Sequence, residues 1–242
     1  METTAPVPTD TATELSGDRT YQKLATRIGA LITQGEFEVG ARLPSERSLA
    51  ERFDVSRTLV REAIIVLEIQ NLVEVRGGSG IYVCAPASTA ARSTTFKPPA
   101  GPGPFELLRA RCLIEAEIAA TAAEHRKDSD LDRIFAALAA MREHIHDKAA
   151  NEAADRLFHL RIAEATGNSV LLQMVTALWD HTKAPIWSQM EAHFHTPALR
   201  LASQDDHQRV FNALLERDAA GARAALRAHI ERVIGEFAQA WR

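Results

Sequence analysis

The sequence of 242 residues is 46% hydrophobic and 25% charged, an ordinary balance for a globular protein with enough length for two modest domains. The net charge of −4 excludes a protein that coats nucleic acid through bulk charge, and the presence of only two cysteines, Cys84 and Cys112, excludes a disulfide framework. No apolar run is long enough to span a membrane and no signal peptide opens the sequence, so we expect a cytoplasmic protein with no membrane partner.

The first part of the sequence predicts a disordered tail and then three helices. Residues 1–18 are rich in Thr, Pro and Ala and form the expected tail. Apolar residues at helical spacing predict a first helix over residues 20–34, with Thr20 as its N-cap and Gly35 as its stop. Ser45 is the expected N-cap of a second helix, and Ser56 is that of a third helix that runs to about residue 70.

A β-hairpin is expected after the third helix. Two short runs of β-type residues, 72–75 and 81–83, are joined by the glycine-rich sequence Gly77-Gly78-Ser79-Gly80. The order of three helices and a hairpin predicts a winged helix-turn-helix domain over residues 19–84.

The rest of the chain predicts a linker and a helical domain. Residues 85–104 contain five prolines together with Ser, Thr and Gly, which is typical of a linker. Residues 105–242 are rich in Ala and Leu at helical spacing, with breaks near residues 127–128, 148–151, 167–168, 191–197 and 218–221. About six helices packed as a bundle are expected, so the predicted fold class is mainly α, with a winged helix-turn-helix domain before an all-helical one.

The third predicted helix carries the side chains best suited to read DNA. A helix-turn-helix places the N-terminal end of its second helix in the major groove, and that end here contains Ser56, Arg57, Thr58 and Arg61. Arginines suit phosphates or the edge of guanine, and hydroxyls suit phosphates. Arg47 is expected to contact the flanking backbone, and the wing glycines Gly77 and Gly78 to approach the minor groove. The alternative is an amphipathic helix whose exposed face is basic by chance.

The second half of the sequence contains four side chains that predict a metal site. Asp155 and His159 are four residues apart and project from one helix face. His207 and His229 share faces with apolar residues and therefore point inward. Burying these groups without partners would cost several kcal/mol, and one divalent cation, Zn, Ni, Mn or Fe(II), would satisfy all four. Considered singly, an inward histidine is more often a hydrogen-bonded core residue, and an Asp-x-x-x-His pair a surface pair.

These motifs carry a resemblance to a known family. Residues 20–83 resemble the winged-helix domain of the GntR family in the sequences Leu43-Pro44-Ser45-Glu46-Arg47, Ser56-Arg57-Thr58, Val60-Arg61-Glu62-Ala63, Gly77-Gly78-Ser79-Gly80 and Tyr82-Val83. The resemblance implies that Arg47, Ser56, Arg57, Thr58, Arg61, Gly77 and Gly78 contact DNA. It also implies a homodimer that binds a palindromic operator, since two-fold symmetry doubles the site that one recognition helix reads.

The helical part resembles the FCD ligand domain of the FadR-type subgroup. The matching sequences include Arg111-Cys112-Leu113-Ile114-Glu115, Asp155 to His159, Asp206-His207 and Ala228-His229-Ile230. The resemblance implies a divalent metal held by Asp155, His159, His207 and His229, and a small carboxylate effector assisted by Arg111. A guanidinium suits this role because its fork binds both carboxylate oxygens. Arg109 is the weaker candidate, and the alternative role for Arg111 is an intrahelical pair with Glu115.

A narrower resemblance joins the sequence to the hexuronate regulators of this subgroup, the UxuR/ExuR kind. It rests on Leu108-Arg109-Ala110-Arg111, on the stretch from Trp179 to Trp187, and on residues 76–83. It implies a regulator, expected to be a repressor of sugar-acid catabolism, whose effector is a hexuronate or its keto derivative. The alternatives are a regulator that senses another small organic acid, a metal-dependent enzyme on the same ligands, and an architectural DNA binder without an effector. No catalytic residue is expected. The sequence leaves open the metal, the operator, the exact effector and the sign of regulation.

Overall fold

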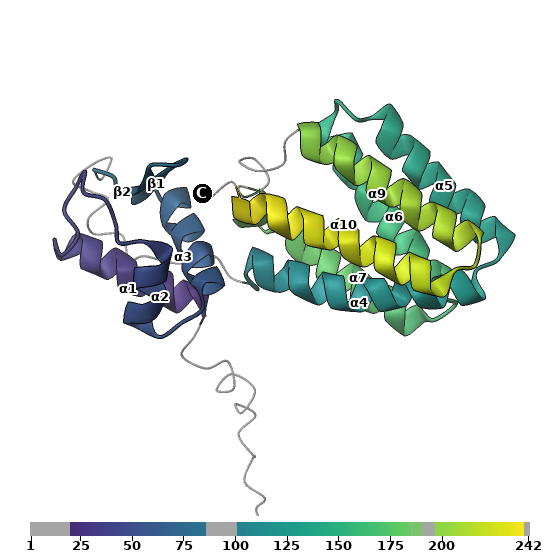
Figure 1. The fold of residues 1–242 in the computed structure, drawn as a ribbon, viewed down its shortest axis with the longest axis horizontal. Coiled ribbons are helices and arrows are strands. Elements are labelled where there is room, and N and C mark those ends of the chain that lie inside the picture. The colour runs from purple at the N-terminus through teal and green to yellow at the C-terminus, as the bar shows by residue number, and fades with distance from the viewer. Residues whose placement is uncertain (1–19, 86–100, 185, 189, 191–196, 240–242) are drawn as a thin grey trace, which may run out of the picture. The chain divides into compact units, whose positions relative to one another are not determined.

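A computed structural model describes residues 20–85 and 101–239, except residues 185, 189 and 191–196. The chain divides into two compact units, Met1–Pro99 and Ala100–Arg242, and each is described by itself (Figure 1). The predicted tail and most of the predicted linker lie outside the described residues, so both stay predictions. None of the helices in the described ranges has the length and apolar character that a membrane span needs.

The N-terminal unit contains three helices and a two-stranded sheet. The helices are α1 (Tyr21–Thr33), α2 (Glu46–Phe53) and α3 (Arg57–Ile69), and the strands are β1 (Val73–Arg76) and β2 (Gly80–Val83). The hydroxyls of Thr20, Ser45 and Ser56 cap the three helices by accepting hydrogen bonds from backbone amides, which confirms the three predicted N-caps. The core between α1 and α3 contains Ile28, Val60 and Ile64, none of which has measurable exposure.

The two strands of the wing differ slightly from their predicted ranges, 72–75 and 81–83. The strands pair antiparallel from Val73 opposite Val83 to Arg76 opposite Gly80, so both reach one residue closer to the turn than predicted. The segment before α2 also joins this sheet, since Arg42 forms a bridge with Tyr82. The sequence predicted only an extended connector there, because an isolated bridge to a distant strand leaves no local pattern.

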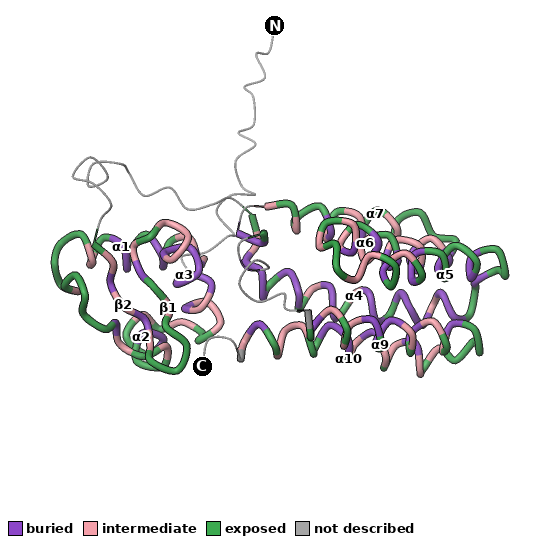
Figure 2. The backbone as a smooth tube through the Cα atoms, turned by 90° about the horizontal axis from the view of Figure 1, so that it is seen from above, coloured by how far each residue is buried: buried purple, intermediate pink, exposed green. Residues whose placement is uncertain are grey.

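The second unit is an all-helical bundle, which confirms the predicted fold class. Its described helices are α4 (Pro104–His125), α5 (Asp128–Glu143), α6 (Lys148–Ala165), α7 (Ser169–Asp180), the 3₁₀ turn η2 (His181–Lys183), α9 (Pro197–Leu215) and α10 (Ala219–Gln239). Helix α4 packs against α6, α7, α9 and α10, and residues along its whole length are buried (Figure 2). It is the central helix of the unit.

Two of the predicted helix breaks are displaced by a few residues, since the structure has them at residues 144–147 and 216–218. The break expected at residues 148–151 lies within the first turn of α6, because the carboxylate of Asp147 accepts a hydrogen bond from the amide of Ala150 and starts the helix there. The break expected at residues 218–221 overlaps the start of α10, which begins at Ala219. Helix α4 also begins inside the predicted linker, at Pro104, where proline suits a first helical position.

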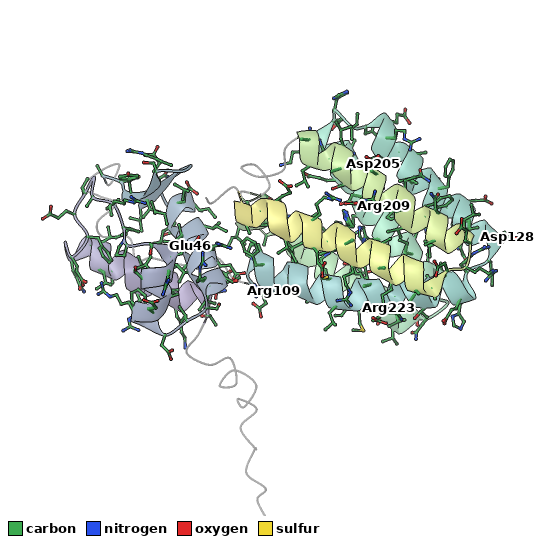
Figure 3. All side chains as sticks on the ribbon, viewed as in Figure 1. Glu46, Arg109, Asp128, Asp205, Arg209 and Arg223 are labelled. Atoms are coloured by element: carbon green, nitrogen blue, oxygen red, sulfur yellow. The ribbon has the colours of Figure 1, made fainter. Side chains whose placement is uncertain are left out.

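Two arginines tie the C-terminal ends of α4 and α9 together. Arg126, just after α4, donates from Nε to the carbonyl of Leu214 (3.1 Å) and from Nη2 to that of Leu215 (2.8 Å). Arg217, just after α9, donates to the carbonyls of Glu124 (3.1 Å) and Arg126 (3.0 Å). Each arginine thus binds carbonyls at the other helix's end, and we call this arrangement the reciprocal cap. A further ion pair joins α10 to α4, between Arg223 and Glu117, and Figure 3 labels Arg223 on α10.

Candidate metal centre and nucleic-acid interface

The N-terminal end of α3 presents the predicted DNA-reading residues. Ser56 accepts a hydrogen bond from the amide of Leu59 (3.2 Å) and so fixes the start of the helix. The Arg57 side chain is 60% exposed, and Thr58, next along the helix, is half-buried. Val60 lies on the opposite, buried face of the helix. The exposed face of α3 therefore carries hydroxyl and guanidinium groups, which suit a phosphate backbone and base edges.

Arg61 is held by a residue that the sequence analysis did not single out. Its Nε lies 2.8 Å and 3.0 Å from the two carboxylate oxygens of Glu46 on α2, and both side chains are only 14% exposed. Glu46 also lies 3.5 Å from Arg57. In the absence of DNA, Glu46 therefore joins the two helices of the helix-turn-helix through Arg61. The only signal in the sequence was that Glu46 precedes Arg47 at the start of α2.

The remaining predicted contacts with DNA are exposed. Arg47 pairs only with Glu51 on its own helix, at 2.9 Å, and its side chain is 81% exposed. Gly77 and Gly78 form the exposed tip of the wing. Gly78 has a φ of +70°, which glycine adopts without strain, and a Cβ at Gly77 would meet no atom within 4 Å. Both glycines leave the backbone at the tip open to a close approach.

In the helical unit, three helices bring the four predicted metal ligands together. Asp155 and His159 come from α6, His207 from α9 and His229 from α10, and their ligand atoms all lie within 4.8 Å of one another. Asp155 Oδ1 is 3.2 Å from His207 Nε2 and 3.6 Å from His159 Nε2. The Nε2 atoms of His207 and His229 are 3.1 Å apart. The histidines are buried, whereas the carboxylate of Asp155 is 28% exposed.

Atoms without hydrogen-bond partners provide a test of whether this cluster fits a metal. Asp155 Oδ1 and His159 Nε2 are both buried and have no such partner among the described residues. Two Nε2 atoms that face each other, as in His207 and His229, compete for one proton when no cation lies between them. One carboxylate and three imidazoles are also the donors that zinc, nickel, manganese or iron(II) accept. The residues therefore fit a divalent cation.

A further carboxylate, Glu115, orients one of the histidines, and a second, Asp206, lies near another; the sequence analysis assigned neither of them this place. Glu115 Oε2 on α4 accepts a hydrogen bond from His159 Nδ1 at 2.5 Å, which leaves Nε2 of that ring facing the cluster. Asp206 Oδ2, next to His207 on α9, lies 3.6 Å from His229 Nδ1. Asp206 is itself held by Arg209 and by Arg232, whose Nε is 2.8 Å away. Carboxylates in this position fix the tautomer and orientation of metal-binding histidines.

The three histidines of the cluster differ in the direction of their pKa shifts. Burial, with repulsion from His229, lowers the pKa of His207 well below its usual value, and burial also lowers the pKa of His229. Burial lowers the pKa of His159 too, but the carboxylates of Glu115 and Asp155 outweigh it and raise this pKa. Burial raises the pKa of Asp155, but His159 and the other histidines hold it well below its usual range. Neutral His207 and His229 and an ionised Asp155 are the protonation states that metal ligands need.

Arg111 lies beside the cluster and also makes the intrahelical pair that was its alternative role. Its Nε donates to Glu115 Oε1 at 2.7 Å, and its guanidinium carbon lies 3.8 Å from the centre of the Trp179 ring. Burial raises the pKa of Glu115, but Arg111 and His159 lower it to about 2. Glu115 thus connects Arg111 to His159. Trp179 is part of the buried core and contacts Arg111 there.

A cavity adjoins the cluster. It encloses about 650 Å³ of space not filled by atoms, part of it open to solvent. Asp155, His207 and His229 line it on one side together with Arg111. Its other walls contain polar residues of α6 and α9 and apolar residues, namely Asn151, Arg200, Ser203, Gln204, Leu108, Met141, Trp179, Trp187, Leu199, Ile230, Val233 and Phe237. Three of the four predicted ligands and the predicted effector-binding arginine therefore share one cavity, whereas His159 and Arg109 are not among its lining residues.

Known proteins resemble both units. Residues 20–83 match the family described as bacterial regulatory proteins, gntR family, and residues 106–232 match the FCD domain. The "Uxu operon transcriptional regulator" of Escherichia coli strain K12 is 39% identical over 90% of this chain and 86% of its own length. The "Exu regulon transcriptional regulator" of the same strain is 37% identical over 88% and 82%. The "Putative L-lactate dehydrogenase operon regulatory protein" of that strain is 32% identical over 88% and 84%.

The family matches cover most of the described residues. The first coincides with the winged helix-turn-helix unit, and the second with the helical unit from α4 to α10 that contains the four-ligand cluster. The resemblance to the FadR-type subgroup is thereby confirmed. The chain belongs to the GntR family of bacterial regulatory proteins, in the subgroup with an FCD domain, and is a transcription regulator.

Proposed function

We propose that this protein is a ligand-responsive repressor of sugar-acid catabolism whose effector is a hexuronate or its keto derivative. The observation that carries the proposal is the cavity that Asp155, His207 and His229 share with Arg111. Relatives named for the Uxu operon and the Exu regulon support the choice of effector class. As a regulator of bacterial genes, the protein acts on DNA in the cytoplasm.

The DNA contacts are assigned to the exposed residues of the winged unit. Arg57, with Ser56 and Thr58, is placed in the major groove, and Arg61 joins it after exchanging its partner Glu46 for DNA. Arg47 binds the flanking phosphates, and Gly77 and Gly78 let the wing tip approach the minor groove. The protein binds a palindromic operator as a homodimer. Light scattering at micromolar concentration, free and with operator DNA, should give the mass of two chains, and a monomer in both conditions would refute the dimer.

Asp155, His159, His207 and His229 hold one divalent cation per chain in this proposal. The chemistry that the cation supplies is a positive centre that accepts oxygen ligands from an effector. Glu115 keeps the ring of His159 oriented whether or not an effector is present. Elemental analysis of protein purified without chelators or a metal-affinity tag should find one metal per chain. His229→Ala should lower that content and weaken the response to effector while largely keeping DNA affinity.

Arg111 binds the effector carboxylate from the side opposite the cation. Its hydrogen bond to Glu115 uses only Nε, and Trp179 supports the plane of the guanidinium. Because Glu115 and Trp179 already fix this side chain, little rotamer freedom is lost when a carboxylate binds. Arg111→Ala should therefore weaken effector binding and leave DNA binding by the empty protein intact.

The test of the whole proposal is the DNA affinity of the metal-loaded protein with and without galacturonate, glucuronate and their keto derivatives. An effector changes DNA affinity only if it binds the two states of the regulator differently, and a typical coupling corresponds to a change of about 5- to 150-fold. A response to L-lactate but to no hexuronate would favour another organic acid, as the name of one relative suggests for that relative. Turnover of sugar acids after metal addition would instead favour an enzyme.

A further inference from the structure

The effector cavity extends from the cluster along one face of α9. Arg200, Ser203, Gln204 and the ligand His207 all line the cavity. Their spacing is that of one helix face, and the rise per residue separates Arg200 from His207 by about 10 Å along the axis of α9. One stripe of α9 therefore leads from the metal-type cluster to a second guanidinium two turns away.

Arg200 differs from the other arginine of the cavity because none of the described residues provides a carboxylate that pairs with it. Arg111 is paired with Glu115, whereas no ion pair or hydrogen bond joins Arg200 to any residue that the structure describes. Its Nε is also buried without a hydrogen-bond partner among those residues. A buried donor without an acceptor costs free energy, and the cost is greater for a charged group. An oxygen-rich ligand in the cavity would remove this cost.

The neighbours of Arg200 offer further hydrogen-bonding groups. The amide nitrogen of Gln204 donates to the carbonyl of Leu138 at 3.3 Å, and that of Asn151 donates to the carbonyl of Met141 at 2.8 Å. These bonds fix both amides, and each retains a carbonyl oxygen that can accept from a hydroxyl. Ser203 adds a hydroxyl to the same part of the cavity. Such a wall binds a chain of hydroxyl or keto oxygens, and apolar walls opposite bind the carbon frame.

We propose that Arg200, with Ser203 and Gln204, forms a distal subsite that binds the oxygen groups at the end of the effector remote from the cation. The inference rests on the proposed function, in which the carboxylate of the effector lies at the cation and Arg111. A three-carbon hydroxy acid held at the cation is too short to reach Arg200, whereas a six-carbon sugar acid spans more of the distance. Arg200 therefore selects six-carbon sugar acids over short hydroxy acids.

The experiment is calorimetric titration of the full chain, loaded with Zn²⁺, with D-galacturonate and with L-lactate. The variants are Arg200→Gln, Arg200→Lys and a control, Arg142→Gln, which removes an exposed guanidinium of α5 outside this cavity. Arg200→Gln should weaken galacturonate binding about 10- to 100-fold, the range expected for loss of a charged hydrogen bond. The same variant should change the affinity for lactate less than about twofold. Arg200→Lys should recover part of the loss, and Arg142→Gln should match the parent.

Each result decides one of the two proposals. Unchanged galacturonate affinity in Arg200→Gln overturns the distal subsite and leaves the proposed function standing. An equal loss for both ligands also overturns it, because it places Arg200 at the metal end or in the general support of the fold. The zinc content of each variant, measured beside the titrations, should stay at one per chain, and its loss in Arg200→Gln counts as that second outcome. A parent protein that binds no hexuronate refutes the proposed effector class, and the distal subsite with it.

Discussion

At the scale of single residues, one carboxylate behind the four-ligand cluster is hydrogen-bonded to a ligand histidine. Glu115 links His159 to Arg111, whereas Asp206, which Arg209 and Arg232 hold, lies 3.6 Å from His229 Nδ1. Because the pKa of Glu115 falls from 4.5 to about 2 in the folded protein, its ionised form stabilises the fold. That contribution is complete above about pH 4.5 and is lost as the pH falls toward 2.

Glu115→Gln should weaken metal binding without removing any proposed ligand. The variant replaces the charged acceptor of the His159 Nδ1 hydrogen bond with an amide, and changes behind the ligands typically cost about 10- to 100-fold in affinity. Competition with a chromophoric chelator measures this affinity. Glu117→Gln on the exposed side of the same helix is the matched control and should bind metal like the parent. Equal metal affinity in Glu115→Gln and the parent would show that His159 needs no orienting carboxylate.

Arg57→Ala and Arg61→Ala should both abolish specific DNA binding, yet differ in stability. Arg57 is 60% exposed, so its loss should leave the melting temperature of the winged unit unchanged. Loss of Arg61 leaves the largely buried carboxylate of Glu46 without its closest partner, which should cost about 1–2 kcal/mol. Fluorescence anisotropy with operator DNA and chemical denaturation separate the two effects. Normal operator binding by both variants would mean that α3 is not the recognition helix.

At the scale of helices and strands, the sequence predicts features that depend on neighbouring residues but not contacts between different helices. The caps Thr20, Ser45 and Ser56 act on amides within three residues, so the sequence reveals them. The inward orientation of His207 and His229 follows in the same way from helical periodicity. The contacts of Glu115 with His159 and of Glu46 with Arg61 join different helices, and one sequence without its fold contains no record of such pairs.

The wing offers a prediction at this scale. Gly80 begins β2 with a φ of +122°, a backbone conformation that side chains disfavour, and a Cβ there would lie 2.4 Å from Arg42 Nε. The end of Arg42 can move away, but the backbone strain remains, so Gly80→Ala should destabilise the wing by about 1–3 kcal/mol. Hydrogen exchange of residues 73–83 in the full chain measures this loss. In Gly77→Ala the added Cβ meets no atom within 4 Å, so the amide hydrogens of the wing should exchange as in the parent. Equal exchange in both variants would contradict the assigned strain.

At the scale of the whole molecule, the cluster connects three helices of the bundle, α6, α9 and α10. A cation bound only by the folded state should therefore stabilise the entire helical unit. At a free metal concentration of 100 times the dissociation constant, the expected gain is about 2.7 kcal/mol. Addition of a chelator should lower the melting temperature of the parent protein, and His207→Ala should melt at the same temperature with and without chelator. If neither chelator nor added metal changes the melting temperature of the parent protein, the cluster is a polar core that binds no metal.

The reciprocal cap determines where α4 and α9 can move apart. Arg126 and Arg217 fasten the two helices at their C-terminal ends, while Arg111 on α4 and Arg200 on α9 line the cavity nearer the other ends. A relative tilt of the two helices about the cap would therefore displace their N-terminal ends most. Helix α4 has 22 residues, so a tilt of roughly 5° about the reciprocal cap would displace its first residue by about 3 Å. That first residue, Pro104, is also the end of α4 that is nearest in sequence to the winged unit, so the largest displacement would occur where the segment from that unit joins the bundle.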